Sequence, residues 1–336
     1  MNKLFLVLLF TVIFMSKSFA ASDKDVWDTL VIENRNLPST ITVGCWENPR
    51  WIGSNAPGSA AEIRSWGLNV TSAHAEFFAS IDDNGELILP GFQDDKHQGA
   101  GSVDYPEFLS VIKDIHKNNM LPVMGLFIHN FETVSEKGMK RFFSRLSRDL
   151  KNNKIPKIIF IPCWEIQGDW PAWPEGATRD CYIDPKIFNS KIWMIKRARD
   201  SARASNITLA VAMAAEYENR HLNKKGSIGH DYIEGLKACD IVGADYYPTN
   251  KEGAVWAFQD ADKWITALRG SKPFAFFEYC IEIADRETKE PIIWTNEEKI
   301  KFIKDTCELL KKTPIIEEID WWFIGKGQGA RIKYGE

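Results

Sequence analysis

Residues 158–173 read IIFIPCWEIQGDWPAW and combine an apolar run with a carboxylate and three tryptophans. The apolar run is typical of a strand that is buried on both faces of a parallel sheet. Glu165 follows it, and partial burial at such a strand end favours the protonated form of a carboxyl group. Trp170 and Trp173 offer flat faces on which a sugar ring can stack. The stretch therefore indicates general acid chemistry on a sugar. A lone Glu after an apolar run is more often a surface residue, so the chain must also supply a partner.

Eight apolar segments of strand length alternate with helical patterns along the chain. This alternation predicts a closed (β/α)8 TIM barrel, and the missing glycine-rich first turn argues against a doubly wound sheet. The expected strands span residues 40–46, 68–73, 121–128, 158–165, 207–215, 241–247, 273–277 and 316–324. The expected helices span residues 23–34, 60–67, 105–118, 135–151, 185–205, 231–238, 254–269 and 296–311.

The expected barrel departs from a regular one in two places. A β-hairpin insertion is expected after the second strand, because Asp83, Asn84 and Gly85 separate the short strand patterns at 78–81 and 86–89. Only twelve residues follow Ile324, which is too few for a full eighth helix. Either the N-terminal helix covers that side of the barrel, or the last helix is vestigial.

Residues 1–20 have the pattern of a cleavable secretory signal peptide. Lys3 precedes an apolar run at 4–15, and small residues end at an expected cleavage site after Ala20. The apolar run is shorter than a membrane span of about 20 residues. We therefore expect a secreted or periplasmic protein without a membrane anchor, in which residues 21–336 form a single catalytic domain.

The charge and the cysteine pattern argue against several classes of function. The formal net charge is −4 and no basic patch stands out, so nucleic acid and anionic membrane surfaces are poor candidates for partners. The six cysteines form no C-x-x-C pair, and neither an H-E-x-x-H run nor a His-x-His on the first strand occurs. We expect a monomer without metal or cofactor, whose partner is a polysaccharide or oligosaccharide substrate.

Glu278 is the partner that the barrel supplies for Glu165. Barrel enzymes place their chemistry at the C-terminal ends of the strands, and these two glutamates end the expected fourth and seventh strands. In a retaining glycosidase two such carboxyl groups lie about 5–5.5 Å apart, one as nucleophile and the other as acid and then base. Further candidates at strand ends are His129, Glu216, Glu218, Asp245, Tyr247, Trp46, Trp321 and Trp322. Structural roles are at least as common for these acidic residues. Only one of the last two tryptophans can face the site, because neighbours on a strand alternate.

These residues resemble the retaining (β/α)8 glycoside hydrolase clan, and within it most of all glycoside hydrolase family 26, the β-mannanases and their relatives. The family pattern R-P-x-H-E-x-N-G-x-W at strand four is matched by IPCWEIQGDW at 161–170. The pattern D-I-V-G-x-D-x-Y at strand six is matched by DIVGADYY at 240–247, and the family's strand-three His by His129. The likeness covers most of the barrel.

The resemblance implies that Glu165 is the acid/base and Glu278 the nucleophile. It also implies that Tyr247 hydrogen-bonds and orients the nucleophile, and that Trp170 lines a subsite on the leaving-group side. An aromatic platform beneath the reacting sugar is common on strand eight of this clan, where Trp322 lies. The full expected sugar-binding set is His129, Trp164, Trp170, Trp173, Tyr247 and Trp322.

Three departures from the family pattern surround the expected acid/base. Ile161 replaces the family's Arg, Trp164 its His, and Gln167 its Asn. In most of the clan the residue before the acid/base is polar and reaches the sugar near its 2-hydroxyl, which Trp164 cannot do in the same way. The sequence predicts an exported retaining β-glycoside hydrolase, endo-acting on a mannan-like polymer, a glucan or a bacterial exopolysaccharide. The alternative is a catalytically inactive carbohydrate-binding TIM barrel.

Overall fold

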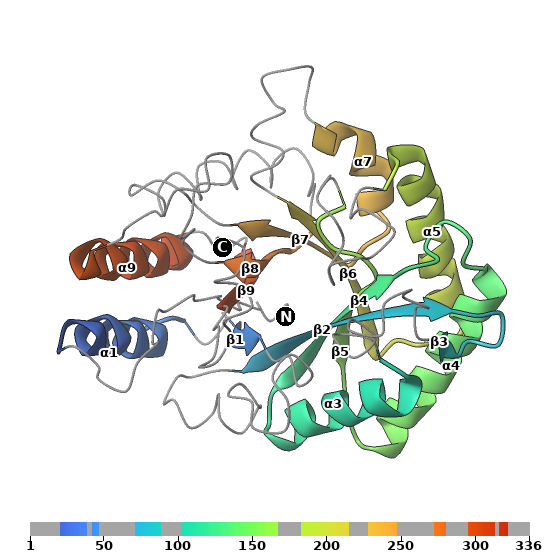
Figure 1. The fold of residues 1–336 in the computed structure, drawn as a ribbon, viewed down its shortest axis with the longest axis horizontal. Coiled ribbons are helices and arrows are strands. Elements are labelled where there is room, and N and C mark those ends of the chain that lie inside the picture. Colours follow the sequence, from blue (N-terminus) through green and yellow to red (C-terminus); the bar gives the residue numbers. More distant parts are fainter. Residues whose placement is uncertain are drawn as a thin grey trace, which may run out of the picture.

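The computed structural model contains a closed barrel of eight parallel strands (Figure 1). It describes residues 21–38, 42–46, 71–88, 103–166, 183–214, 228–246, 272–279, 295–312 and 316–321. The strands are β1 (Thr42–Trp46), β2 (Ser72–Ile81), β4 (Leu121–Ile128), β5 (Ile158–Ile161), β6 (Ile207–Ala214), β7 (Ile241–Tyr246), β8 (Phe274–Tyr279) and β9 (Ile316–Trp321). Each pairs in parallel with the next, and β9 pairs with β1 to close the ring. The predicted (β/α)8 TIM barrel is confirmed.

The second barrel strand differs from its expected span of 68–73. β2 is ten residues long and ends in an antiparallel pairing with β3 (Leu87–Ile88), so the pairing continues the barrel strand rather than forming a separate ribbon. The turn uses Gly85 at φ 81°, where a Cβ would lie 2.4 Å from the Phe142 backbone nitrogen of the adjacent helix. Only glycine suits both this backbone conformation and this close approach.

The helices begin where side chains can satisfy their first backbone N–H groups. Asp104 accepts from the Glu107 N–H, Ser135 from the Gly138 N–H, and Asp184 from the Lys186 and Ile187 N–H groups. The described helices are α1 (Ala21–Arg35), α3 (Tyr105–Lys117), α4 (Glu136–Asn152), α5 (Pro185–Ser201), α7 (Ile228–Leu236) and α9 (Asn296–Lys312). The expected helices at 60–67 and 254–269 lie outside the described residues.

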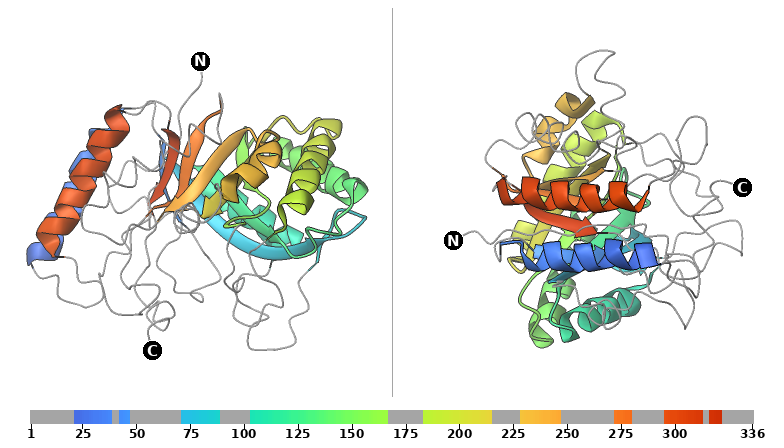
Figure 2. Two further views of the ribbon diagram at one scale, coloured as in Figure 1. Left: turned by 90° about the horizontal axis from the view of Figure 1, so that it is seen from above. Right: turned by 90° about the vertical axis from the view of Figure 1, so that its left-hand side faces the viewer.

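The first and last described helices lie side by side (Figure 2). Val26 and Leu30 of α1 are buried in the same apolar cluster as Ile303 of α9. Lys311 and Glu33 add an ion pair at 3.6 Å between the two helices. The N-terminal helix therefore packs next to α9, as one of the two expected arrangements requires. Residues after 321 are outside the described part of the chain.

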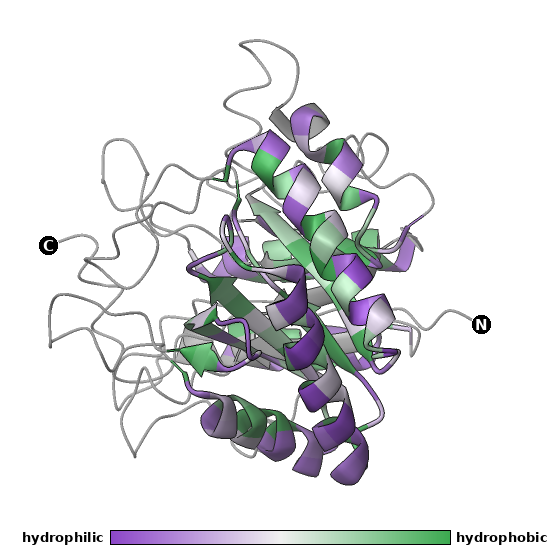
Figure 3. Ribbon diagram, turned by 90° about the vertical axis from the view of Figure 1, so that its right-hand side faces the viewer, coloured by the Kyte–Doolittle hydropathy of each residue, from purple (hydrophilic) through white to green (hydrophobic). Residues whose placement is uncertain are grey.

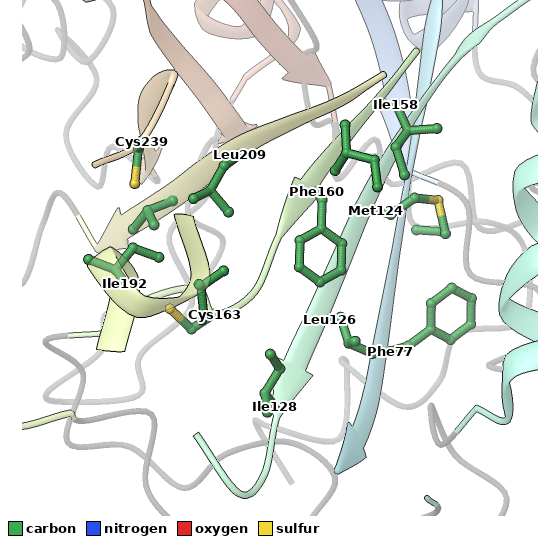
Figure 4. Packing of buried hydrophobic residues seen from close by; sticks show 14 of the residues in the cluster. Phe77, Met124, Leu126, Ile128, Ile158, Phe160, Cys163, Ile192, Leu209 and Cys239 are labelled. Atoms are coloured by element: carbon green, nitrogen blue, oxygen red, sulfur yellow. The ribbon is translucent and has the colours of Figure 1, made fainter. Parts of the chain in front are cut away.

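Two apolar layers follow from the two-residue alternation along the strands. The outer layer lies between the strands and the helices and includes Phe77, Leu126 and Phe160 (Figure 4). The inner layer fills the barrel and includes Val123 and Ile159. Hydrophilic residues gather on the outward faces of the helices (Figure 3). None of the described helices has the length and apolar character of a membrane span.

Candidate active site

The two expected catalytic glutamates lie near the C-terminal ends of parallel strands. Glu165 follows β5 by four residues, and Glu278 is the penultimate residue of β8. β5 and β8 are the fourth and seventh strands of the barrel, and all eight strands run in the same direction. The backbone therefore brings both residues to one mouth of the barrel. Glu278 is placed here by its backbone alone.

The backbone of Glu165 is held in an uncommon conformation. Its φ is 48°, in the left-handed region that non-glycine residues rarely enter. Such a conformation costs about 1–3 kcal/mol and persists only where neighbouring structure enforces it. The Glu165 N–H donates to the Ala212 carbonyl of β6 at 3.0 Å, which provides part of that enforcement. The backbone of Glu165, whose side chain is half-buried, is thereby tied to β6.

Helix α7 holds Ile166 and Ile183, the described residues on either side of segment 167–182. The Ile183 N–H donates to the Ile166 carbonyl at 2.9 Å, which joins the two ends of segment 167–182. The buried Tyr232 hydroxyl of α7 donates to the Ile183 carbonyl at 2.7 Å. The residue directly after Glu165 is thus held by Ile183, which Tyr232 supports in turn.

Replacing Tyr232 with Phe tests this support. The change leaves the buried Ile183 carbonyl without the hydroxyl, so we expect the free energy of unfolding to fall by about 1–3 kcal/mol. We also expect slower turnover, because Ile183 and its bonded partner Ile166, which directly follows Glu165, lose part of their support. Denaturant unfolding and initial rates measure the two effects. Tyr105→Phe is a matched control, because it removes a hydroxyl that donates to Asp149 at 2.9 Å between α3 and α4. Equal rate losses in both variants would contradict the assignment.

Trp164 forms part of the floor of the barrel mouth. Its side chain is 8% exposed and belongs to the inner apolar layer. Its ring meets those of Phe78 and Phe127 edge-on, at centroid distances of 5.5 and 5.2 Å. His129 contacts the same two rings at 5.9 and 5.5 Å. The structure thus brings His129 and Trp164 into one aromatic cluster, where Trp164 contributes mainly packing.

A register shift in β8 lies directly before Glu278. Ala244 of β7 pairs with Phe276, but Asp245 pairs with Glu278, so Phe277 is the extra residue of a bulge. Bulges bend a strand and redirect side chains, and they are frequent beside active sites. The bulge aligns the backbone of residue 278 with that of Asp245, a buried residue of β7.

His74 on β2 is a buried polar residue that the sequence analysis did not single out. It is 2% exposed, and its Nδ1 lies 3.3 Å from the Phe277 carbonyl oxygen. Its Nε2 lies 3.5 Å from Oε1 of Glu76 on the same strand. Burial lowers the pKa of His74 to about 3, so the ring is neutral at physiological pH. The alternation of Ser72, His74 and Glu76 in an otherwise apolar strand was the available signal.

The lowered pKa of His74 predicts acid sensitivity. Between pH 6.5 and 3 the unfolded chain binds a proton at His74 that the folded chain does not, so stability falls as pH falls. The loss reaches about 2 kcal/mol at pH 5. Denaturant unfolding of wild type and His74→Asn at pH 7.5 and 5 measures this pH-dependent loss of stability, which the variant should lack. Val123→Ala, in the same layer, should lower stability equally at both pH values. An unchanged pH dependence in His74→Asn would contradict the prediction.

The remaining expected site residues lie outside the described part of the chain: Trp170, Trp173, Glu216, Glu218, Tyr247 and Trp322. The backbones of Trp46 and Trp321 lie at the C-terminal ends of β1 and β9. No group of three or more His, Cys, Asp or Glu side chains within the described ranges could hold a metal ion.

Comparisons with known proteins bear on the fold. No protein-family model matches the sequence, and no curated protein matches it. The solved structure of the Bacillus subtilis mannanase BCman is similar, with a TM-score of 0.50 and 16% identity over 90% of this chain and 85% of that one. The Bacillus subtilis mannanase man26 gives 0.49 and 16%, covering 91% and 86%. A GH18 chitinase from Pseudoalteromonas aurantia gives 0.47 and 11%, covering 87% and 100%.

At this level of identity the likeness to BCman concerns the fold. One fold hosts many unrelated activities, so the activity has to be argued from the site. The expected likeness in fold to the β-mannanases is confirmed: the chain shares the architecture of a mannanase along nine-tenths of its length.

Proposed function

We propose that this chain is a retaining β-glycoside hydrolase that acts on a β-linked polysaccharide. The observation that carries the proposal is the placement of Glu165 and Glu278 at the C-terminal ends of the fourth and seventh strands of one closed barrel. The bulge before Glu278 and the left-handed backbone of Glu165 add support, because strained backbone and bulges gather at functional sites.

The proposed reaction has two steps. Glu165 gives its proton to the glycosidic oxygen while a carboxylate oxygen of Glu278 attacks the anomeric carbon, so the glycosidic bond breaks and the leaving group departs as an alcohol. Glu165 then takes a proton from water, whose oxygen attacks the anomeric carbon and displaces Glu278. The sugar leaves with its original anomeric configuration, and both carboxyl groups return to their starting states.

The residues specify the substrate class less closely than the reaction. The motifs at strands four and six resemble family 26, and the fold is similar to that of a mannanase, which favours a mannan-like polymer. Trp164 packs against Phe78 and Phe127 where the family has a polar residue. We therefore also propose a glucan or a bacterial exopolysaccharide as an alternative substrate class. We further propose cleavage within the polymer chain, by a protein exported through residues 1–20.

One observation favours a second candidate, a barrel that binds carbohydrate without cleaving it. The residue before Glu165 is a buried tryptophan that cannot hydrogen-bond a sugar hydroxyl as the family's His does. Such a barrel would bind oligosaccharides through the remaining mouth residues and would release no product.

Reducing-sugar release across a panel of β-linked polysaccharides separates the two candidates. If the protein is a glycoside hydrolase, wild type should release reducing sugar from at least one polymer and Glu278→Gln from none. Glu297→Gln on the exposed start of α9 is the matched control and should retain full activity. Binding of a polymer by a folded wild type that never cleaves it would support the second candidate.

A further inference from the structure

The bulge of β8 leaves one residue without a partner in the register of either neighbouring strand. The register with β7 passes from Phe276 to Glu278, and the register with β9 passes from Phe276 to Tyr279. Phe277 is therefore paired in neither ladder, although its side chain is fully buried in the inner layer. A buried backbone carbonyl requires a donor, because leaving it without one costs free energy comparable to a lost hydrogen bond.

His74 supplies that donor from across the barrel interior. Its Nδ1 lies 3.3 Å from the Phe277 carbonyl oxygen, and β1 and β9 separate β2 from β8 in the ring. Because burial keeps the imidazole neutral, one ring nitrogen carries a hydrogen and the other does not. A carbonyl accepts only from a nitrogen that carries a hydrogen, so we infer that Nδ1 carries it; Nε2 then faces Oε1 of Glu76 at 3.5 Å, which is long for a hydrogen bond.

Two glycines leave the space that this contact needs. A Cβ on Gly125 of β4 would lie 3.2 Å from Nε2 of His74 and 3.1 Å from Cγ of Glu76. A Cβ on Gly243 of β7 would lie 2.4 Å from the ring of Phe277. A side chain at position 243 would displace the Phe277 ring, and one at position 125 would press against the His74 ring. The inner layer is therefore shaped around the His74 and Phe277 pair, whose rings meet edge-on at 6.4 Å.

We propose that His74 is a positioning residue for Glu278: it donates to the Phe277 carbonyl and so holds the bulge that sets the register of the next residue. The catalytic consequence rests on the proposed function, whereas the hydrogen bond and the bulge do not. A displacement of about 1 Å at a reacting group can cost about 100-fold in rate. The expected effect of losing the bond is of that size and falls on kcat.

Asn and Gln at position 74 separate this role from simple packing. The amide nitrogen of Asn can occupy the place of Nδ1, whereas the longer Gln carries its amide near the place of Nε2. His74→Asn should keep kcat close to wild type, and His74→Gln should lower kcat about 100-fold with little change in KM. Val123→Ala in the same layer controls for loosened packing and should leave kcat unchanged. Equal kcat values for wild type and His74→Gln would overturn the proposal.

Two measurements keep the proposal testable if no polymer is cleaved or if the variants do not fold. Long-range 1H–15N NMR spectra of the wild-type protein distinguish the two neutral tautomers, and we expect Nδ1–H at His74. An Nε2–H tautomer would overturn the proposal, because Nδ1 would then have no hydrogen to donate to the Phe277 carbonyl and the proton would serve Glu76 instead. Crystal structures of wild type and His74→Gln should show the bulge at Phe277 only in wild type. If wild type cleaves no polymer but shows the expected tautomer and bulge, the result would count against the glycosidase. The positioning of the Glu278 backbone by His74 would still be supported.

Discussion

Replacement of Glu278 with Gln is expected to lower kcat/KM on the cleaved polysaccharide by about 10^4- to 10^6-fold. The carboxylate oxygen forms the covalent bond to the anomeric carbon, and a neutral amide is a poor nucleophile. Losses of this order follow the removal of a catalytic nucleophile in other enzymes. Initial rates of reducing-sugar release measure the effect, and denaturant unfolding checks that the variant is folded.

A small-nucleophile experiment sharpens this prediction. In Glu278→Ala the space left by the carboxylate admits azide, which should attack an activated β-glycoside directly and give the α-glycosyl azide. Azide rescue with inversion assigns the nucleophile to this position, because displacement now occurs once rather than twice. Glu297→Gln on α9 should show neither loss nor rescue. Full activity of Glu278→Gln would remove the residue from the mechanism.

Replacement of Glu165 with Gln is expected to cost about 10^2- to 10^4-fold on a polysaccharide, whose leaving group requires a proton. The formation of the intermediate should be much less affected for an aryl β-glycoside with a very acidic phenol, because that leaving group departs without protonation. Breakdown of the intermediate should slow for both substrates, since Glu165 also activates the water. The expected signature is a rapid burst of phenol followed by slow turnover.

Comparing the two substrates controls for an effect of the substitution on the fold. A residue that supports only the fold would lower the rates on both by the same factor. Azide should accelerate the slow phase of Glu165→Gln and give the β-glycosyl azide, since the anion needs no general base. Equal losses on both substrates without azide rescue would assign Glu165 a structural role. The Glu165 backbone already contributes to the fold, because its N–H donates to the Ala212 carbonyl.

Most of the barrel could be predicted from the sequence because several of its strands are nearly continuous apolar runs. Strands such as β4 and β6 are buried on both faces, so their apolar runs coincide closely with their spans. β2 was misplaced because it carries Ser72, His74 and Glu76 into the barrel interior, which interrupts the apolar pattern. Its start was therefore predicted four residues early, and its end was assigned to a separate hairpin.

The site could be predicted only as far as strand ends can be located. Glu165 and Glu278 follow apolar runs, and the topology brings those runs to one mouth. The bulge at Phe277 depends on the registers that β8 adopts with two neighbours distant in sequence, so no local pattern encodes it. The contact between His74 and Phe277 joins residues 203 positions apart and emerges only when the barrel closes.

Trapping the covalent intermediate tests the central claim most directly. A 2-deoxy-2-fluoro glycoside of the sugar that the polysaccharide panel identifies, with a good leaving group, should inactivate the protein and add the mass of one sugar. Peptide mapping by mass spectrometry should locate that sugar on Glu278. The account predicts this single label, and its slow loss as water completes the reaction. A label on another residue, or hydrolysis that inverts the anomeric configuration and forms no adduct, would contradict it.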